Sequence, residues 1–356
     1  ANSLLKVISI LRERAWQLCD LQYAQIRINI DTTVKTVYGN QQGARKGHNP
    51  KHPGKEGLRP ILCFIEETRE YLLGKLRKGA SVTGKEAADF IAAIHAQLPG
   101  CVQYVLLRAD GEFLCWQSVK ASIEAGFKFI IANRGCTPIF DPDKWYRPFK
   151  RQAIEYNSCF YQPIGWQHPC RFVVMRILKE LKQPSNQPQQ CALFKDDQYT
   201  YRIFCTNLAG AAHQIIADYD KRADVENLVG EAKREGLDMI PSAKFKNNYA
   251  FFQIVMLAYN IWRYMKMIAQ YSVAGRCPTS DNILKGIMTN TVRIARLKLL
   301  FIAAKVVHHS NRDRIKYSIH DSRTPEMIYL LQFLDNARCR PRPWHKQSIW
   351  SPRFAI

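Results

Sequence analysis

The order of strand and helix patterns between residues 23 and 132 constrains the fold of this chain more than any other feature. Apolar and polar residues alternate from Tyr23 to Ile30, which predicts a strand that runs directly into Asp31. Further patterns predict strands around 61–66 and 70–76, a helix over 84–98, a strand at 102–108, a helix near 116–125 and a strand at 127–132. This order predicts a mixed α/β core.

The regions outside this core differ from it in composition. Residues 135–205 are rich in aromatic residues and proline, and strand-like pieces at 171–177 and 199–204 predict a β-rich insertion. Helical patterns cover 3–22 and dominate again from the insertion to about residue 335. The predicted organisation is an N-terminal helix (1–22), a core in two parts (23–134 and 213–270), a β-rich insertion (135–212) and a helical, basic C-terminal region (271–356).

The charge of the chain favours a polyanionic partner. Lys and Arg number 52 against 30 Asp and Glu, a formal net charge of +22, which suits either nucleic acid or an anionic membrane surface. The apolar runs at 250–259 and 299–304 are shorter than the roughly 18 residues that a membrane-spanning helix needs. Nucleic acid is therefore the favoured partner, and no membrane association is expected.

Positive charge is concentrated toward the C-terminus. The last 116 residues hold 19 Lys and Arg against 5 Asp and Glu, counted along the sequence. A surface that neutralises phosphates releases counterions, so we expect DNA affinity to fall steeply with salt. A solubilising surface is the alternative. The candidate groups are Arg293, Arg296 and Lys298, and Arg312, Arg314 and Lys316.

The cysteines do not form a metal-binding pattern. Eleven of them are scattered from Cys19 to Cys339 without a CxxC pair, and the nine histidines approach them only at His168 and Cys170. Zinc fingers, ribbons and knuckles need paired ligands at short spacing, so His168 and Cys170 remain an isolated half-site. No secretory signal opens the chain. We expect reduced cysteines in a cytoplasmic protein.

The segment from about Asp218 to Lys233 has the pattern of a helix on which one carboxylate stands among cations. At 100° per residue, one arc of about 60° contains Tyr219, Arg222, Glu226 and Lys233, whereas Asp220, Asp224 and Glu231 lie on another face. A carboxylate can bind a divalent metal while Arg and Lys beside it bind phosphates. A solvated helix face with mixed charges is the alternative.

Two aspartates follow apolar strand patterns. Asp31 ends the pattern at 26–30, and Asp110 comes shortly after 105–107. Open α/β sheets place ligand groups at the carboxyl ends of their strands, although either aspartate alone could simply end a strand or form a turn. Together with Glu226 they could hold two Mg²⁺ ions about 4 Å apart, an arrangement that cuts phosphodiesters.

The spacing of Tyr219, Arg222, Glu226 and Lys233 resembles the Tyr-Arg-Glu-Lys signature of bacterial insertion-sequence transposases of the DDE class. The sequence around this signature is similar to the same family, as are the stretches at 30–34, 39–44, 47–50, 108–110 and 257–260. The resemblance extends from about residue 25 to 335. One departure is that Gly111 and Glu112 follow Asp110 where the family usually has Ser-Gly.

The resemblance implies an RNase H-like catalytic core interrupted by the β-rich insertion. It implies that Asp31, Asp110 and Glu226 bind Mg²⁺ or Mn²⁺, as two ions, and are the catalytic residues. It further implies that Tyr219, Arg222 and Lys233 bind DNA, with Tyr219 and Arg222 holding the strand in a hairpin-forming route. Trp145 or Trp166 of the insertion could stack on a flipped base, or be core residues.

The same resemblance implies an enzyme that cuts double-stranded DNA at transposon ends and joins the released end to target DNA. We expect it to act as a homodimer in the bacterial cytoplasm, associated with the nucleoid. Family members usually carry a longer N-terminal region for end recognition, so residues 1–22 are a candidate remnant of a DNA-binding region. Two alternatives are a transposase remnant that binds DNA without cutting it, and an RNase H-like nuclease that hydrolyses DNA without strand transfer.

Overall fold

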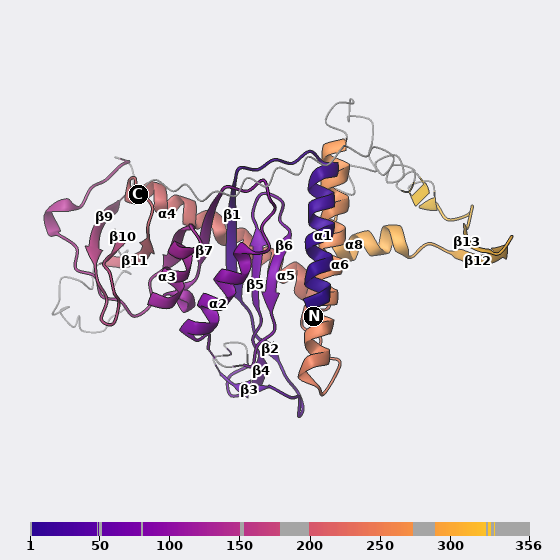
Figure 1. Ribbon diagram of the computed structural model, residues 1–356, viewed down its shortest axis with the longest axis horizontal. Helices are drawn as coiled ribbons and strands as arrows, with labels where there is room; N and C mark the ends of the chain where they lie inside the picture. The colour runs from indigo at the N-terminus through magenta and orange to yellow at the C-terminus, as the bar shows by residue number, and fades with distance from the viewer. Residues whose placement is uncertain are drawn as a thin grey trace, which may run out of the picture.

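An eight-stranded mixed sheet forms the centre of the protein (Figure 1). The computed structural model describes residues 2–47, 49, 52–79, 81–149, 153–178, 199–272, 289–324, 327, 328 and 331. The sheet order is β6-β5-β1-β7-β8-β11-β10-β9, which confirms the predicted mixed α/β class. Its first five strands are β1 (Gln25–Thr32), β5 (Ile61–Ile65), β6 (Tyr71–Lys75), β7 (Tyr104–Ala109) and β8 (Lys128–Ala132).

Of these five strands, β5 alone runs opposite to the others. β1 runs parallel to β7, and β7 parallel to β8. On its other side β1 pairs antiparallel with β5, which pairs antiparallel with β6. A small separate sheet is formed by β2 (Lys35–Thr36), β4 (Glu56–Leu58) and β3 (Arg45–Lys46). The carboxyl ends of β1 and β7 therefore lie next to each other in the middle of the large sheet.

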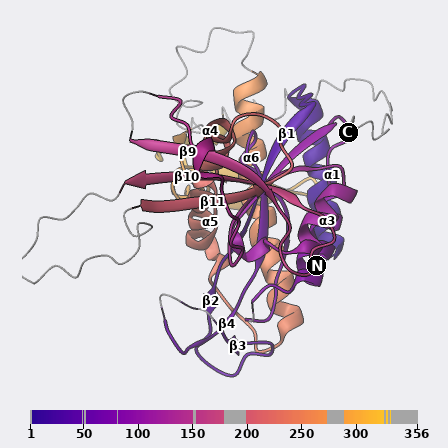
Figure 2. The same cartoon turned by 90° about the vertical axis from the view of Figure 1, so that its left-hand side faces the viewer.

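The region predicted as a β-rich insertion extends the same sheet. β11 (Tyr199–Thr206) pairs antiparallel with β8, β10 (Cys170–Leu178) pairs with β11, and β9 (Ile154–Tyr161) completes the edge. Figure 2 shows these three strands projecting to one side of the helices. The pieces at 171–177 and 199–204 are strands as predicted, whereas β9 has no regular alternation and was not predicted.

Alternating apolar side chains give the central strands two buried faces, as the two-residue period of a strand requires. On one face, Ile26, Ile28 and Ile30 pack with α2 (Gly84–His95) and α3 (Trp116–Glu124). The other face packs against α4 (Ala212–Asp220), α5 (Asp224–Ala232) and α6 (Phe245–Ser272). No helix within the described residues is long and apolar enough to span a membrane.

Helix α1 (Asn2–Leu18) lies beside α6 at the β6 edge of the sheet and is fastened there by a buried ion pair (Figure 1). Arg12 Nε lies 3.2 Å from Glu70 Oε2, and Trp16 Nε1 donates to Glu70 Oε1 at 2.7 Å. From α6, Asn260 accepts a hydrogen bond from the Tyr71 amide at 2.8 Å and donates to the Tyr71 carbonyl at 2.7 Å. These polar contacts hold both helices against the edge strand.

The helical pattern that the sequence predicts up to about residue 335 is interrupted by a β-hairpin, and the prediction is wrong for this part. β12 (Ala304–His309) pairs antiparallel with β13 (Arg312–Tyr317). Ser310 and Asn311 between them have φ of 53° and 56°. A two-residue turn with both residues at positive φ matches the twist of a hairpin. A short helix, α8 (Val292–Ala295), precedes the hairpin.

Candidate functional site

Asp31 and Asp110 lie side by side where β1 and β7 end. The parallel register pairs Ile30 with Ala109, so the two acids are the next residues on strands about 4.8 Å apart. Burial raises the pKa of Asp31. Burial, followed by the negative charge of Asp31, raises the pKa of Asp110 to about 6. The fold thus brings together two of the three predicted carboxylates and places them where ionisation is disfavoured without a cation.

Arg222 reaches this pair of acids from the helical segment after α4. Its Nη2 atom donates to Asp31 Oδ1 at 3.0 Å and to the Ile30 carbonyl at 2.9 Å. The charge of Arg222 opposes the effect of burial and favours the ionised form of both aspartates. Tyr219 Oη donates to the Ala109 carbonyl at 3.4 Å, and its ring centroid is 5.9 Å from the Arg222 guanidinium carbon. The first two residues of the signature therefore contact the ends of β1 and β7.

Glu226 lies near this group with an exposed side chain. After burial, the negative charge of Glu226 makes a small further contribution to raising the pKa of Asp31. It sits in the first turn of α5, directly after a 3₁₀ turn at Lys221–Ala223. The segment from 218 to 233 is helical as predicted but is not a single α-helix, because the 3₁₀ turn has three residues per turn and shifts the helical phase of the residues after it.

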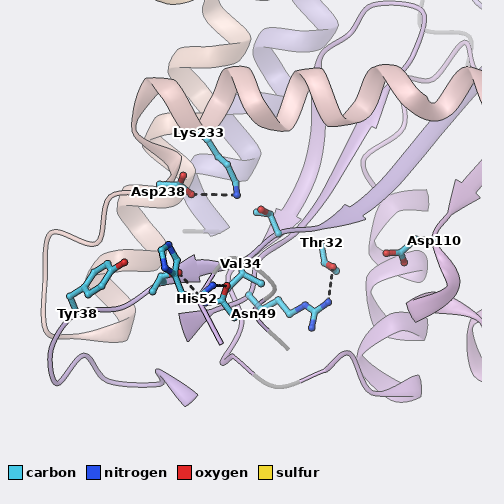
Figure 3. A pocket seen from close by; sticks show the side chains of 11 residues that line it. Thr32, Val34, Tyr38, Asn49, His52, Asp110, Lys233 and Asp238 are labelled. Carbon is cyan, nitrogen blue, oxygen red and sulfur yellow. Dashed lines mark hydrogen bonds and ion pairs between the residues drawn. The ribbon is translucent and has the colours of Figure 1, made fainter. Parts of the chain in front are cut away.

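Lys233 lies farther from the aspartates, along a cavity of about 520 Å³ that also reaches Asp110 (Figure 3). It begins a π-helical turn, Lys233–Leu237, and its Nζ is 3.8 Å from Asp238 Oδ1. Tyr38 and His52 meet edge to face in the cavity wall, with ring centroids 6.2 Å apart. The remaining lining residues are Thr32, Thr33, Val34, Thr36, Asn49 and Arg59.

The donor chemistry of Asp31 and Asp110 fits a divalent cation. Carboxylate oxygens are the ligands that Mg²⁺ takes from proteins, and a cation would relieve the repulsion between the two acids. Within the described ranges, however, no three His, Cys, Asp or Glu side chains come together as a ligand group. Glu226 does not complete a three-carboxylate group in this conformation, and His168 instead packs against the Trp116 ring with centroids 5.8 Å apart.

Glu112 is a site residue that the sequence patterns did not select. Its Oε2 atom accepts hydrogen bonds from Thr32 Oγ1 at 2.9 Å and Arg59 Nη2 at 2.6 Å, and its Oε1 from the Val82 amide at 3.0 Å. Its own amide donates to Asp110 Oδ1 at 3.2 Å. Glu112 therefore ties the end of β1 to the Asp110 loop. In the sequence, the one indication of Glu112 was that Gly111 and Glu112 follow Asp110 where the resembled family usually has Ser-Gly.

The structure bears on two other expectations. The Trp145 ring is covered by the Arg176 guanidinium at 3.9 Å, and Trp166 packs on Trp116 and the core. Both rings are thus in contact with other side chains of the protein, and the packing of Trp166 favours the core alternative for that residue. Glu231, which the helical phase places on a different face from Glu226, is buried and accepts a hydrogen bond from the Val292 amide at 3.3 Å.

The raised pKa of Asp110 leads to an expected pH dependence of stability. Because folding raises this pKa from 3.8 to about 6, the folded chain binds more protons than the unfolded chain between these values. The free energy of unfolding should therefore fall as pH rises from about 4 to about 6. Urea denaturation of the metal-free protein measures the fall, and Asp110→Asn should reduce it. An identical profile in the variant would assign the dependence to other groups.

Comparison with known proteins gives one match that covers most of the chain. A family model described as "Transposase DDE domain group 1" matches residues 6–339. No curated protein matches the chain.

Two solved structures are similar at low identity. One is a piggyBac transposase synaptic complex with hairpin DNA, at 11% identity and a TM-score of 0.43, covering 78% of this chain and 59% of that one. The other is Marinitoga piezophila Argonaute in complex with 5′ OH guide RNA, at 9% identity and a TM-score of 0.23, covering 73% and 32%. The chain thus spans less than two thirds of either protein.

Proposed function

The chain belongs to the transposase DDE domain group 1 family, and we propose that it is a metal-dependent DNA transposase. It would cut double-stranded DNA at the ends of a mobile element and join the released 3′ end to target DNA. The observation that carries this proposal is the meeting of Asp31 and Asp110 at the ends of two parallel strands, with Arg222 bound to Asp31. The sheet from β6 to β8 would be the RNase H-like core.

Asp31 and Asp110 are proposed to hold Mg²⁺ or Mn²⁺, and Glu226 to complete the set once it turns toward them. Two such ions, when bound, activate a water nucleophile and stabilise the leaving oxygen of an in-line displacement. Arg222 neutralises Asp31 in the metal-free protein and carries a guanidinium that can bind a phosphate through two parallel hydrogen bonds. Glu112 holds the Asp110 loop in a fixed position through the Asp110 carboxylate.

The cavity between Asp110 and Lys233 is the proposed path of the cut strand (Figure 3). The Lys233 ammonium can bind a phosphate, and the Thr36 hydroxyl, which accepts a hydrogen bond from Asn49 Nδ2 at 3.0 Å, can donate to a phosphate oxygen. Tyr38 is 70% exposed, so its ring is accessible to a base. Stacking on an aromatic ring tolerates any base, because every base has a π face. These groups together suit a single DNA strand that runs from the carboxylates along the cavity.

A supercoiled plasmid that carries candidate element ends distinguishes the proposal from its two alternatives. With Mg²⁺, a transposase should produce cuts at the ends and then joined products. A simple nuclease should hydrolyse the plasmid without joining, and a remnant should shift its mobility without cutting it. Chelation of the metal should stop cutting in the first two cases. Binding without any cut under all metal conditions would overturn the proposed activity.

Glu226→Gln is expected to lower Mg²⁺-dependent cleavage by about a hundredfold while leaving DNA affinity nearly unchanged, because the amide removes a charge from the metal site but no contact to phosphate. The matched control is Asp224→Asn. Asp224 is an exposed acid in the same turn of α5 and pairs with Arg69 at 2.7 Å. Equal losses of cleavage in both variants would indicate that the negative charge of α5, rather than a metal ligand at Glu226, determines the cleavage rate.

A further inference from the structure

The β12–β13 hairpin extends away from the eight-stranded sheet, beyond α8 (Figure 1). None of its described side chains is buried, and Val306 and Ile315 are 69% and 60% exposed. A two-stranded hairpin without further packing is only marginally stable in water. A hairpin exposed in this way is therefore expected to have a binding partner.

The register of the hairpin separates its charges between two faces. It pairs Lys305 with Lys316, Val307 with Arg314, and His309 with Arg312. Directly opposed residues share a face, and successive residues alternate between faces. One face therefore carries all four Lys and Arg residues of the two strands: Lys305, Arg312, Arg314 and Lys316.

The opposite face carries the other kinds of side chain. It presents Val306 opposite Ile315, and His308 Nδ1 lies 3.0 Å from Asp313 Oδ1, the single acid of the two strands. Strand geometry is what aligns the cations, because residues two apart on a helix point about 200° away from each other. On the helix predicted from the sequence, Arg314 would point away from Arg312 and Lys316, which are four residues apart and would share a face. The hairpin thus concentrates its positive charge on one surface.

We propose that this basic face binds the phosphate backbone of duplex DNA at a place separate from the carboxylates. Cations two residues apart on a strand are about 6.8 Å apart, far enough for each to bind a different phosphate. A two-stranded ribbon is narrow enough to enter the major groove. The described side chains of the face are cations and Val307, so the contact is to phosphate and independent of base sequence.

The hairpin is connected to the helix that carries Glu226. At its base, the Ser318 amide donates to the Ala303 carbonyl at 2.8 Å. Arg323 Nη1 donates to the Leu297 carbonyl at 2.7 Å in the segment between α8 and the hairpin. The buried Glu231 of α5 holds the start of α8 through Val292. DNA bound by the basic face would therefore be held in a defined position relative to α5.

This inference rests on the proposed function, because it assigns an additional contact to the same DNA substrate. Its test is the salt dependence of binding of the full chain to a duplex of about 30 base pairs, measured by anisotropy without divalent metal. Replacing the four cations with Gln should lower the slope of log K against log salt by about 3 to 4, since each phosphate contact contributes about 0.9. The test variant is K305Q, R312Q, R314Q and K316Q.

A matched control removes four exposed lysines from other elements. This control should change the slope by less than one. If it lowers the slope as much as the hairpin variant, the effect is one of net charge alone and the inference is overturned. The control set is K6Q, K75Q, K85Q and K128Q, all at exposed positions.

A second control changes the opposite face of the same hairpin. V306T with I315T should leave DNA binding unchanged. If this pair, rather than the cations, alters DNA binding or the oligomeric state, the hairpin is a protein-docking element and the inference is overturned. If the hairpin variant lowers the salt slope but the unmodified chain never cuts DNA, only the proposed activity is contradicted. Normal cutting with an unchanged slope would contradict only the inference about the hairpin.

Discussion

Replacing Asp31 or Asp110 with Asn is expected to lower Mg²⁺-dependent DNA cleavage by about a thousandfold or more. Asn keeps the size of the side chain and removes the charge that would hold the cation. The loss of several kcal/mol of charge stabilisation in the transition state corresponds to about three powers of ten in rate. DNA affinity should change little, because it comes mainly from Lys and Arg contacts to phosphate.

Two measurements separate chemistry from binding in these variants. Cleavage of an end-bearing plasmid gives the rate, and anisotropy with labelled duplex gives the affinity. Asp143→Asn is a suitable control, since it removes the same charge from an exposed position on the 3₁₀ turn Pro142–Lys144. Because Asp31 also pairs with Arg222, the stability of the Asp31 variant should be measured as well, by thermal denaturation. Cleavage within tenfold of the wild type in either variant would remove that residue from the proposed site.

The two aspartates could be predicted from the sequence because each follows an apolar strand pattern. A parallel β1–β7 pair then places their carboxylates together without any further information. The break before Glu226 has no such signal. Residues 221–223 form a 3₁₀ turn where Arg222 reaches across to the Ile30 carbonyl, and that contact joins residues 192 positions apart. The helix propensity of the residues around 221–223 gives no information about this contact.

Glu112 and β9 were missed for the same physical reason. Glu112 accepts a hydrogen bond from Arg59, which lies 53 positions away in the sequence, so neither residue belongs to a local sequence pattern. β9 carries a buried Asn157 whose Nδ2 donates to the Asp141 carbonyl at 2.8 Å, and this satisfied amide interrupts the apolar alternation of a strand. The hairpin was missed because exposed strands bury no apolar face and therefore show no period of two. Tertiary hydrogen bonds and solvent exposure both remove the local pattern on which prediction from sequence depends.

Replacing Glu70 with Ala is expected to lower the free energy of unfolding by about 3 to 5 kcal/mol, the cost of leaving one member of a buried ion pair uncompensated. Glu70 is fully buried, and the side chain of its partner Arg12 is 1% exposed. The same substitution leaves the Trp16 indole N–H and the Thr68 hydroxyl without their acceptor. Urea denaturation monitored by tryptophan fluorescence measures the loss.

The control for this prediction is Glu124→Ala. Glu124 is 66% exposed and lies 3.8 Å from Lys120, so its removal should cost less than about 1 kcal/mol. A similar cost for Glu70→Ala would mean that the buried pair adds nothing beyond a surface contact.

The Glu70 result also decides how helix α1 contributes to the protein. If α1 is part of the catalytic core, Glu70→Ala should lower cleavage only where it lowers the folded fraction, and the DNA affinity of the folded protein should be unchanged. If residues 1–22 are instead a remnant of a DNA-binding region, loosening α1 should weaken DNA binding at temperatures where the variant is still folded. The Arg12 contacts to the Tyr71 and Leu72 carbonyls on β6, at 3.1 and 2.9 Å, favour the first outcome, because they tie α1 to the same sheet that carries Asp31 and Asp110.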